Sequence, residues 1–317
     1  MRIRIQSCPV ALLCLLLWLQ VQPAAGQQVA LPPLDLGATS FLDGVGGPGV
    51  FTQEILSPYH AGRINGPNST QLPGANSVDS FAAITEFAFT TRTKFLGAWY
   101  GGEILLPAVH VDVDTDLGIR GKPNGIGDLI FSPLLLQWPE HKLFGKPIFQ
   151  RLHVVEFILP TGSYRRDRAV NIGSNLLTVN PQYAFTVFLT PHLETTARLH
   201  YLWNSKNSSP APAFNASSIQ PGQAVHFNAS ISYALHPRLR AGVAGYYLKQ
   251  ITDSRIGDRS LPGSREQVGG IGPGLLVNTG IVDIFVHAFF ETGAENRPQG
   301  TRVVIRIAKV FANKVTK

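Results

Sequence analysis

The stretch QAVHFNASISYALHPRLRAGVAGYY, residues 223–247, decides the fold because it repeats one alternating pattern on both sides of a turn. Apolar side chains such as Val225 and Phe227 alternate with polar ones such as His226 and Asn228, and His236-Pro237 turns the chain. Side chains on a strand alternate between faces, so the pattern predicts two antiparallel strands of roughly a dozen residues each. Such strands are longer than the roughly 5–6 residues usual in soluble sheets and match the roughly 9–11 tilted residues that cross a bilayer.

Alternating segments of this kind recur along the whole chain, bounded by turn residues. We predict strands at Val50–Ser57, Ser80–Lys94, Ala98–Val113, Ile126–Gln137, Ile148–Pro160, Leu176–Leu189, Leu193–Asn204, Gln223–Leu235, Arg238–Gln250, Glu266–Asn278, Ile281–Glu291 and Thr301–Phe311. Pro133 and Pro181 fall inside two of them, and we expect bulges or strand ends there because proline cannot donate to the ladder. The sequence therefore predicts an all-β protein, an antiparallel transmembrane β-barrel of about 12 strands.

The connections between these strands alternate in length. Tight turns such as Phe95-Leu96-Gly97 and Thr279-Gly280 are separated by long segments rich in Pro, Gly, Ser and Asn. Outer-membrane barrels have short periplasmic turns and long external loops. Trp138–Pro147 is the exception, a medium connection where a short turn is expected. An even strand count is expected to place both termini on the short-turn side.

The first 26 residues are typical of a secretory signal peptide. Arg2 and Arg4 precede an apolar run from Val10 to Leu19, and Ala24-Ala25-Gly26 supplies small residues for cleavage. Both cysteines lie in this segment, so the mature chain is expected to have no disulfide and no Cys-ligated metal. The remaining chain divides into a Gly/Pro-rich periplasmic lead-in at 27–49, the barrel at 50–311 and a tail at 312–317.

Charge is moderate and scattered along the chain. The formal net charge of +7 falls to +5 once Arg2 and Arg4 are removed with the signal peptide. Basic residues form no stripe, so the sequence does not favour a nucleic-acid partner. The basic excess suits either anionic lipid headgroups or a mixed solvated surface.

In the strands at 80–94, 193–204 and 281–291 one face is free of charge, which identifies the side that meets lipid, because a Lys or Arg near the bilayer midplane costs roughly 2–4 kcal/mol there. The opposite face lines the lumen. Its predicted lining residues are Glu86, Arg92, Glu194, Arg198, His200, His226, Asp283, His287, Arg302 and Arg306. We expect the charged members to pair with one another, either as a selectivity filter or as a purely structural ladder. Tyr201, Trp203, Tyr246 and Tyr247 lie near strand ends and are expected in the aromatic girdle.

Catalytic and metal-binding patterns are weak. His226 and Ser230 share a strand face but are roughly 13 Å apart along it, far beyond the ~3 Å of a nucleophile and its base. The nine histidines include no His-x-His or His-x-x-x-His pair, so solvated or lumenal histidines are expected instead of metal ligands. The sequence predicts no cofactor, no metal and no enzymatic activity.

The chain resembles the meta-pathway phenol-degradation proteins, a family of outer-membrane transporters of Gram-negative bacteria, from about Leu34 to Phe311. The stretches that carry the resemblance are Gly125-Ile126-Gly127-Asp128-Leu129, Ser132-Pro133, Leu159-Pro160-Thr161-Gly162-Ser163-Tyr164, Asn171-Ile172-Gly173-Ser174-Asn175, Pro181-Gln182-Tyr183, Gly245-Tyr246-Tyr247-Leu248-Lys249-Gln250 and Gly270-Ile271-Gly272-Pro273-Gly274. The resemblance implies a channel for small hydrophobic or aromatic solutes in the bacterial outer membrane. Phe311, near the end of the last strand, resembles the signal that the barrel-assembly machinery recognises.

Two alternatives stay open. A barrel of about twelve strands has a narrow interior that side chains and an inward-folded segment can fill, which would make the chain a structural or surface-interaction protein. An outer-membrane hydrolase is the less favoured alternative, because its catalytic residues would have to meet across neighbouring strands.

Overall fold

The computed structural model describes residues 29–312. The predicted signal peptide at 1–26 and residues 313–317 of the predicted tail lie outside the described residues. Residue 312 is the last residue of the final strand.

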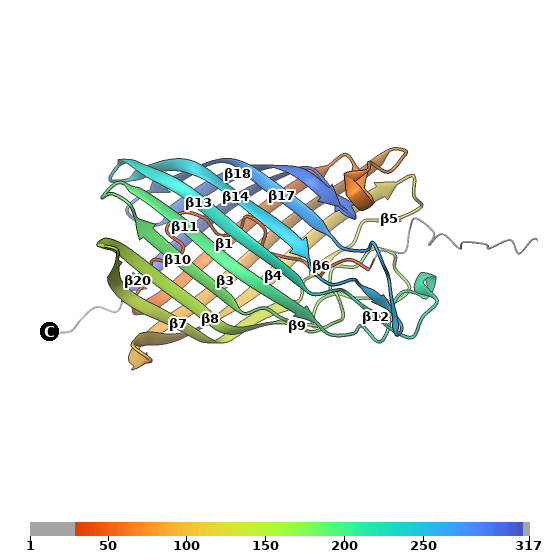
Figure 1. Ribbon diagram of the computed structural model, residues 1–317, viewed down its shortest axis with the longest axis horizontal. Coiled ribbons are helices and arrows are strands. Elements are labelled where there is room, and N and C mark those ends of the chain that lie inside the picture. Colours follow the sequence, from red (N-terminus) through yellow and green to blue (C-terminus); the bar gives the residue numbers. More distant parts are fainter. Residues whose placement is uncertain (1–28, 313–317) are drawn as a thin grey trace, which may run out of the picture.

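Twelve long strands close into one antiparallel barrel, as the alternation predicts (Figure 1). They are β1 (Gly49–Ala61), β3 (Asn76–Phe95), β4 (Ala98–Thr115), β7 (Leu129–Leu143), β8 (Lys146–Leu159), β10 (Gln182–Phe188), β11 (Leu193–Asn204), β13 (Ala224–His236), β14 (Leu239–Gln250), β17 (Gln267–Asn278), β18 (Asp283–Glu295) and β20 (Thr301–Ala312). Each pairs with the next, and β1 pairs with β20 to close the cylinder. Among residues 29–312, no helix is long and apolar enough to cross a membrane.

The two ends of the barrel differ, and we name them the turn end and the loop end. The turn end carries tight turns such as Leu96-Gly97 between β3 and β4, where both residues have positive φ. The loop end carries the long connections, with short elements η1 (Pro67–Ser69), η2 (Pro212–Phe214) and β12 (Ile219–Gln220). In Figure 1 the loop end lies at the right and the turn end at the left.

The expected medium connection at Trp138–Pro147 is wrong. β7 and β8 continue pairing to Leu143 and Lys146, and Phe144-Gly145 turns the chain. Phe144 has φ 50 and Gly145 has φ 76, which is the conformation of a two-residue hairpin turn whose twist matches the strands. The apparent connection was polar enough to suggest a loop, but a strand end outside the apolar band tolerates polar residues.

Both prolines predicted to disturb strands do so. The ladder between β4 and β7 shifts register next to Pro133, between Gly101 and Glu103. The predicted strand at 176–189 is divided into β9 (Thr178–Val179) and β10, with Pro181 in the gap. Each proline removes a ladder donor, and the chain places its irregularity there.

The outer and inner faces follow the predicted alternation. On β13, Val225, Phe227 and Ile231 are exposed outside, while His226 and Asn228 are buried inside. The prediction that Tyr246 belongs to the aromatic girdle is wrong. Its side chain is 3% exposed and lies in the lumen, where its hydroxyl donates to Glu291. Adjacent residues of a strand face opposite sides, so Tyr246 and Tyr247 could not both join a girdle.

Candidate functional site

The chain from residue 29 to residue 48, which we call the lumenal segment, runs inside the barrel (Figure 1). Its backbone N–H groups donate to wall side chains along its length. Leu31 donates to Glu266 at 2.7 Å, Gly37 to Asn228 at 2.8 Å, and Gly44 to Thr186 at 2.9 Å. A buried chain without a ladder needs such partners, because an unpaired buried backbone group is costly.

The lumenal segment passes through the barrel from the loop end to the turn end. The Val29 carbonyl accepts from Ser254, which lies in the long connection between β14 and β17. The Gly44 carbonyl accepts from Gln137, and β1 then begins at Gly49 beside Ala312. The structure differs from the predicted periplasmic lead-in at 27–49: residues 29–48 occupy the lumen, with residue 29 at the loop end, and residue 49 begins β1.

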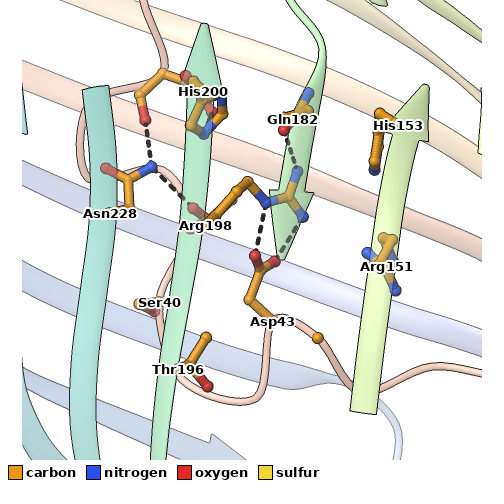
Figure 2. A network of polar contacts seen from close by, with 12 residues as sticks. Ser40, Asp43, Arg151, His153, Gln182, Thr196, Arg198, His200 and Asn228 are labelled. Atoms are coloured by element: carbon orange, nitrogen blue, oxygen red, sulfur yellow. Dashed lines mark hydrogen bonds and ion pairs between the residues drawn. The ribbon is translucent and has the colours of Figure 1, made fainter. Parts of the chain in front are cut away.

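Arg198 of β11 holds this segment by a bidentate ion pair with Asp43 (Figure 2). Its Nε lies 2.7 Å from Oδ2 of Asp43, its Nη2 lies 2.8 Å from Oδ1, and its Nη1 donates to Gln182 at 2.7 Å. Bidentate, charge-assisted bonds of this kind are the strong ones in proteins.

Two histidines of neighbouring strands face a second carboxylate of the segment. His200 of β11 and His226 of β13 are direct cross-strand partners, and their rings stack with centroids 3.8 Å apart. Nε2 of His200 lies 3.7 Å from Oδ2 of Asp35, and Nε2 of His226 lies 3.4 Å from Oδ1. Both histidine side chains are fully shielded from solvent. The sequence places all three residues far apart, and only the barrel and the threaded segment bring them together.

A cluster of apolar side chains packs around part of the segment. Leu36 and Phe41 pack in one cluster with wall residues that include Leu202 and Phe289. The Phe41 ring meets the His287 ring edge to face at 4.8 Å. Gly274 of β17 makes room for this contact, because a Cβ there would overlap the His287 ring and lie 2.9 Å from Phe41 Cζ. The hydrophobic core of the protein is thus inside the barrel and includes the segment.

The predicted lumen residues differ in their burial. Glu86, Glu194, Arg198, His200, His226, His287 and Arg306 are buried, Asp283 and Arg302 are half-buried, and Arg92 is exposed near the turn end of β3. Arg92 lies beyond the register shift that starts at Thr90, where the strand leaves the enclosed lumen.

We expected the charged lumen residues of the wall strands to pair with one another, and the structure gives them other partners. Arg198 pairs with Asp43 of the lumenal segment, and Glu194 accepts from Ser232 and Thr196. The guanidinium of Arg306 lies over the Phe285 ring at 4.0 Å, and that of Arg302 lies over the Tyr59 ring at 4.7 Å. The prediction considered wall strands alone and so omitted the segment that supplies the strongest counter-charge.

A buried group that sequence reasoning missed comes from a bulge in β8. His153 pairs with Leu135 while Val155 pairs with Leu134, so one extra residue of β8 stands between them. The bulge turns both His153 and Glu156 inward, although strict alternation would separate an odd from an even position. Nδ1 of His153 lies 3.8 Å from Glu103 and 3.9 Å from Glu156. In the sequence, the feature that could have indicated this bulge is Pro181, which lies opposite it in the sheet.

One hollow borders the lumenal segment, and a second lies in the barrel wall. A cavity of about 430 Å³ at the turn end is lined by Phe41, Asp43, Arg151, Phe285 and Arg306, among others. A hollow of about 380 Å³ lies at the register shift near Pro133, lined largely by Phe87, Phe89, Tyr100 and Phe131 with Glu103. The first is mixed in character and the second is mostly apolar.

Similar solved structures have the same architecture. An outer-membrane channel from Pseudomonas putida matches with a TM-score of 0.73 and 17% identity over 84% of this chain and 97% of that one. The transport unit of the autotransporter AIDA-I from Escherichia coli matches with a TM-score of 0.51 and 10% identity over 84% of this chain and 91% of that one. At these identities the likeness establishes the fold alone.

A search of curated proteins finds no match. The family described as the MetA-pathway of phenol degradation matches residues 61–307 of the 317, well over half of the chain. The chain therefore belongs to the family of the MetA-pathway of phenol degradation.

Proposed function

We propose that this protein is an outer-membrane channel for small hydrophobic or aromatic compounds, closed at rest by its lumenal segment. The observation that carries the proposal is the segment itself. It fills the lumen from the loop end to the turn end and is held there by side-chain contacts, not by strand pairing. A plug attached in this way can be displaced without breaking the barrel ladder.

The solute class is supported by family membership and by the two hollows. The family description refers to phenol degradation, and phenols are single-ring compounds that a cavity of about 430 Å³ has room for. The wall hollow presents aromatic side chains such as Phe89 and Tyr100. Both features suit a neutral ring with one or two polar groups.

Charged lumen residues are proposed to act as a filter. Arg151, Arg198 and Arg306 surround the turn-end cavity and its neighbourhood, and Asp43 lies among them. An ion that entered this region would lose its hydration and come close to a buried charge of its own sign, whereas a neutral solute incurs neither cost. The lumen is thus expected to favour neutral solutes.

Delivery to the membrane is part of the same proposal. The exposed apolar faces of the strands, Ile231 and Phe290 among them, meet outer-membrane lipid. The final strand β20, with Phe311 near its end, serves as the recognition signal for the barrel-assembly machinery, and the signal peptide directs export.

A structural barrel with a permanently occluded lumen is the second candidate, favoured by the buried apolar contacts of Leu36 and Phe41. A hydrolase is less well supported. The groups that face His226 are the ring of His200 and the carboxylate of Asp35, while Ser230 lies four positions along the same strand.

Uptake by whole Gram-negative cells tests the proposal, because their outer membrane limits entry of phenolic compounds. Cells that make the protein should take up labelled phenol faster than cells with an empty vector, and uptake of arabinose should be equal in both. Purified protein in planar bilayers gives an independent measure of opening. Unchanged phenol uptake, together with bilayers that never conduct even when Asp43 is replaced, would favour the structural barrel.

A further inference from the structure

We propose that Asp35, His200 and His226 form a site for a divalent transition-metal ion of the zinc class, which fastens the lumenal segment to the barrel wall. One ligand atom from each residue lies within 4.8 Å of the other two. The carboxylate comes from the segment, and the imidazoles come from β11 and β13. An ion at this point would join the lumenal segment, which lies outside the ladder, to two wall strands that are paired with each other.

The spacing of the ligand atoms fits a common ion better than it fits hydrogen bonds. Nε2 of His226 and Nε2 of His200 lie 3.4 and 3.7 Å from the two Asp35 oxygens, longer than ordinary N–H···O distances. Ligands held about 2.1 Å from one tetrahedral Zn²⁺ are separated by roughly 3.4 Å, from the bond lengths and angle alone. The three ligand atoms are therefore already near the separation that a shared ion requires. Binding requires the stacked rings, whose planes are 14° apart, to rotate until both Nε2 lone pairs point at the ion.

The imidazole nitrogens are buried and lack partners. Nε2 of His200 and both ring nitrogens of His226 have no hydrogen-bond partner among the described residues. Burying such groups is unfavourable unless something compensates them. A cation bound between the two Nε2 atoms and the Asp35 carboxylate would give both unpartnered nitrogens a partner at the same time.

A supporting contact selects the tautomer of His200 that can bind metal. Nδ1 of His200 lies 3.3 Å from Oδ1 of Asn180, and the Asn180 amide donates to Glu156 at 2.7 Å. The donation to Glu156 leaves the amide oxygen to accept from Nδ1–H of His200. The unprotonated lone pair is then on Nε2, the atom that faces Asp35. Metal-binding histidines almost always have such an outer partner on the second nitrogen.

The other buried cluster, Glu103, His153 and Glu156, is the weaker candidate for this ion. Its nitrogen to oxygen distances are longer, at 3.8 and 3.9 Å. Both carboxylate oxygens of Glu156 already accept hydrogen bonds, from Asn180 and Gln182. It provides one imidazole where the chosen site provides two, and imidazole is the ligand that zinc-class ions prefer over additional carboxylate.

Metal binding is measured first, without reference to transport. The mature full-length protein in detergent, stripped with chelator, is titrated with Zn²⁺ by calorimetry and with Co²⁺ by visible absorption. We expect one ion per chain and Co²⁺ bands of a four- or five-coordinate site. His226→Gln and Asp35→Ala should each weaken Zn²⁺ binding by roughly 100-fold or more, and Asn180→Ala by roughly 10–100-fold.

Two control histidines distinguish binding at this site from binding elsewhere in the barrel. His192→Gln changes an exposed histidine in the turn between β10 and β11 and should keep zinc affinity at the wild-type value. Heat-modifiable gel mobility checks that each variant barrel is folded, and Asp35→Ala leaves the wall strands intact. Wild-type protein that binds no Zn²⁺, or loss of binding in His153→Gln with retention in His226→Gln, would overturn the proposal.

The fastening role rests on the proposed channel function and has its own measurement. Zn²⁺ should lower the open probability of the wild-type channel in planar bilayers and leave that of Asp35→Ala unchanged. If zinc binds as above but conductance does not respond, the fastening role is wrong while the site stands. If no variant conducts at all, the channel function is what fails.

Discussion

Arg198 of the barrel wall and Asp43 of the lumenal segment form a bidentate ion pair, with Nε–Oδ2 and Nη2–Oδ1 distances of 2.7 and 2.8 Å, inside the barrel (Figure 2). Both side chains are less than a tenth exposed. The pair joins positions 155 residues apart in the sequence and is the strongest single polar contact between the segment and the wall. Removal of this ion pair is therefore the most direct way to release the lumenal segment from the wall.

Asp43→Ala should open the channel. The variant leaves the Arg198 guanidinium buried and uncompensated, a change that costs about 3–5 kcal/mol in proteins. Since the segment can move while the ladder cannot, the cost should favour displacement of the segment. Single-channel recording is expected to show a higher open probability than wild type.

Asp43→Ala/Arg198→Ala is the matched control, because it removes the carboxylate and the stranded charge together. We expect its open probability to lie closer to the wild-type value than that of Asp43→Ala alone. Equal opening in the single and double variants would show that Asp43 acts through its backbone contacts instead of its charge.

Acid should open the channel by the same route, because protonation of the Asp43 carboxylate would remove the charge that compensates Arg198. The reference pKa of an aspartate side chain is about 3.9, so a carboxylate of this kind gains its proton only in strong acid. Conductance of the wild type should thus be unchanged from about pH 7 to pH 5 and rise only below about pH 4. Asp43→Asn should lack this acid step, and a step of wild-type size in that variant would assign it to another group.

Much of the fold could be predicted from the sequence because lipid and lumen impose a strict period of two. Ile231 and Ser230 are adjacent, and one faces outward while the other is buried. The same rule placed Glu194 and Arg306 inside the barrel. Strand ends were less predictable, since β7 and β8 extend beyond the apolar band, where polar residues such as His141 no longer distinguish strand from loop.

The candidate site could not be predicted from the alternation of side chains, and the reason is physical. The lumenal segment has no ladder and hence no period, and its glycines and prolines are equally typical of an external linker. The His200–His226 pair depends on strand register, which brings residues of β11 and β13 together without any short His-x-His motif. His153 and Glu156 depend on a bulge that breaks the alternation on which the prediction relied.

Ile231→Arg should impair assembly of the barrel. Ile231 is near the middle of β13 and 46% exposed on the outer face, where a charge costs roughly 2–4 kcal/mol at the bilayer midplane. The fraction of heat-modifiable, folded protein in the outer membrane should fall accordingly. Leu235→Arg, close to the turn at the end of the same strand, should cost only about 0–1 kcal/mol because the charge can reach the interface. Similar folded fractions for the two variants would remove the support for this depth assignment.

Gly274→Ala should loosen the lumenal segment without a change in charge. A Cβ at position 274 would overlap the His287 ring and press on Phe41, which is 1% exposed and part of the central apolar cluster. Displacing Phe41 costs packing contacts, so we expect a lower unfolding temperature and more frequent opening. Gly269→Ala on the same strand is the control, because its nearest neighbour would be Tyr247 Cδ2 at 3.6 Å, an ordinary contact. If both variants unfold and conduct like wild type, the Phe41 contact does not hold the segment in place. If both are equally destabilised, the effect belongs to β17 as a strand and not to the close approach at Gly274.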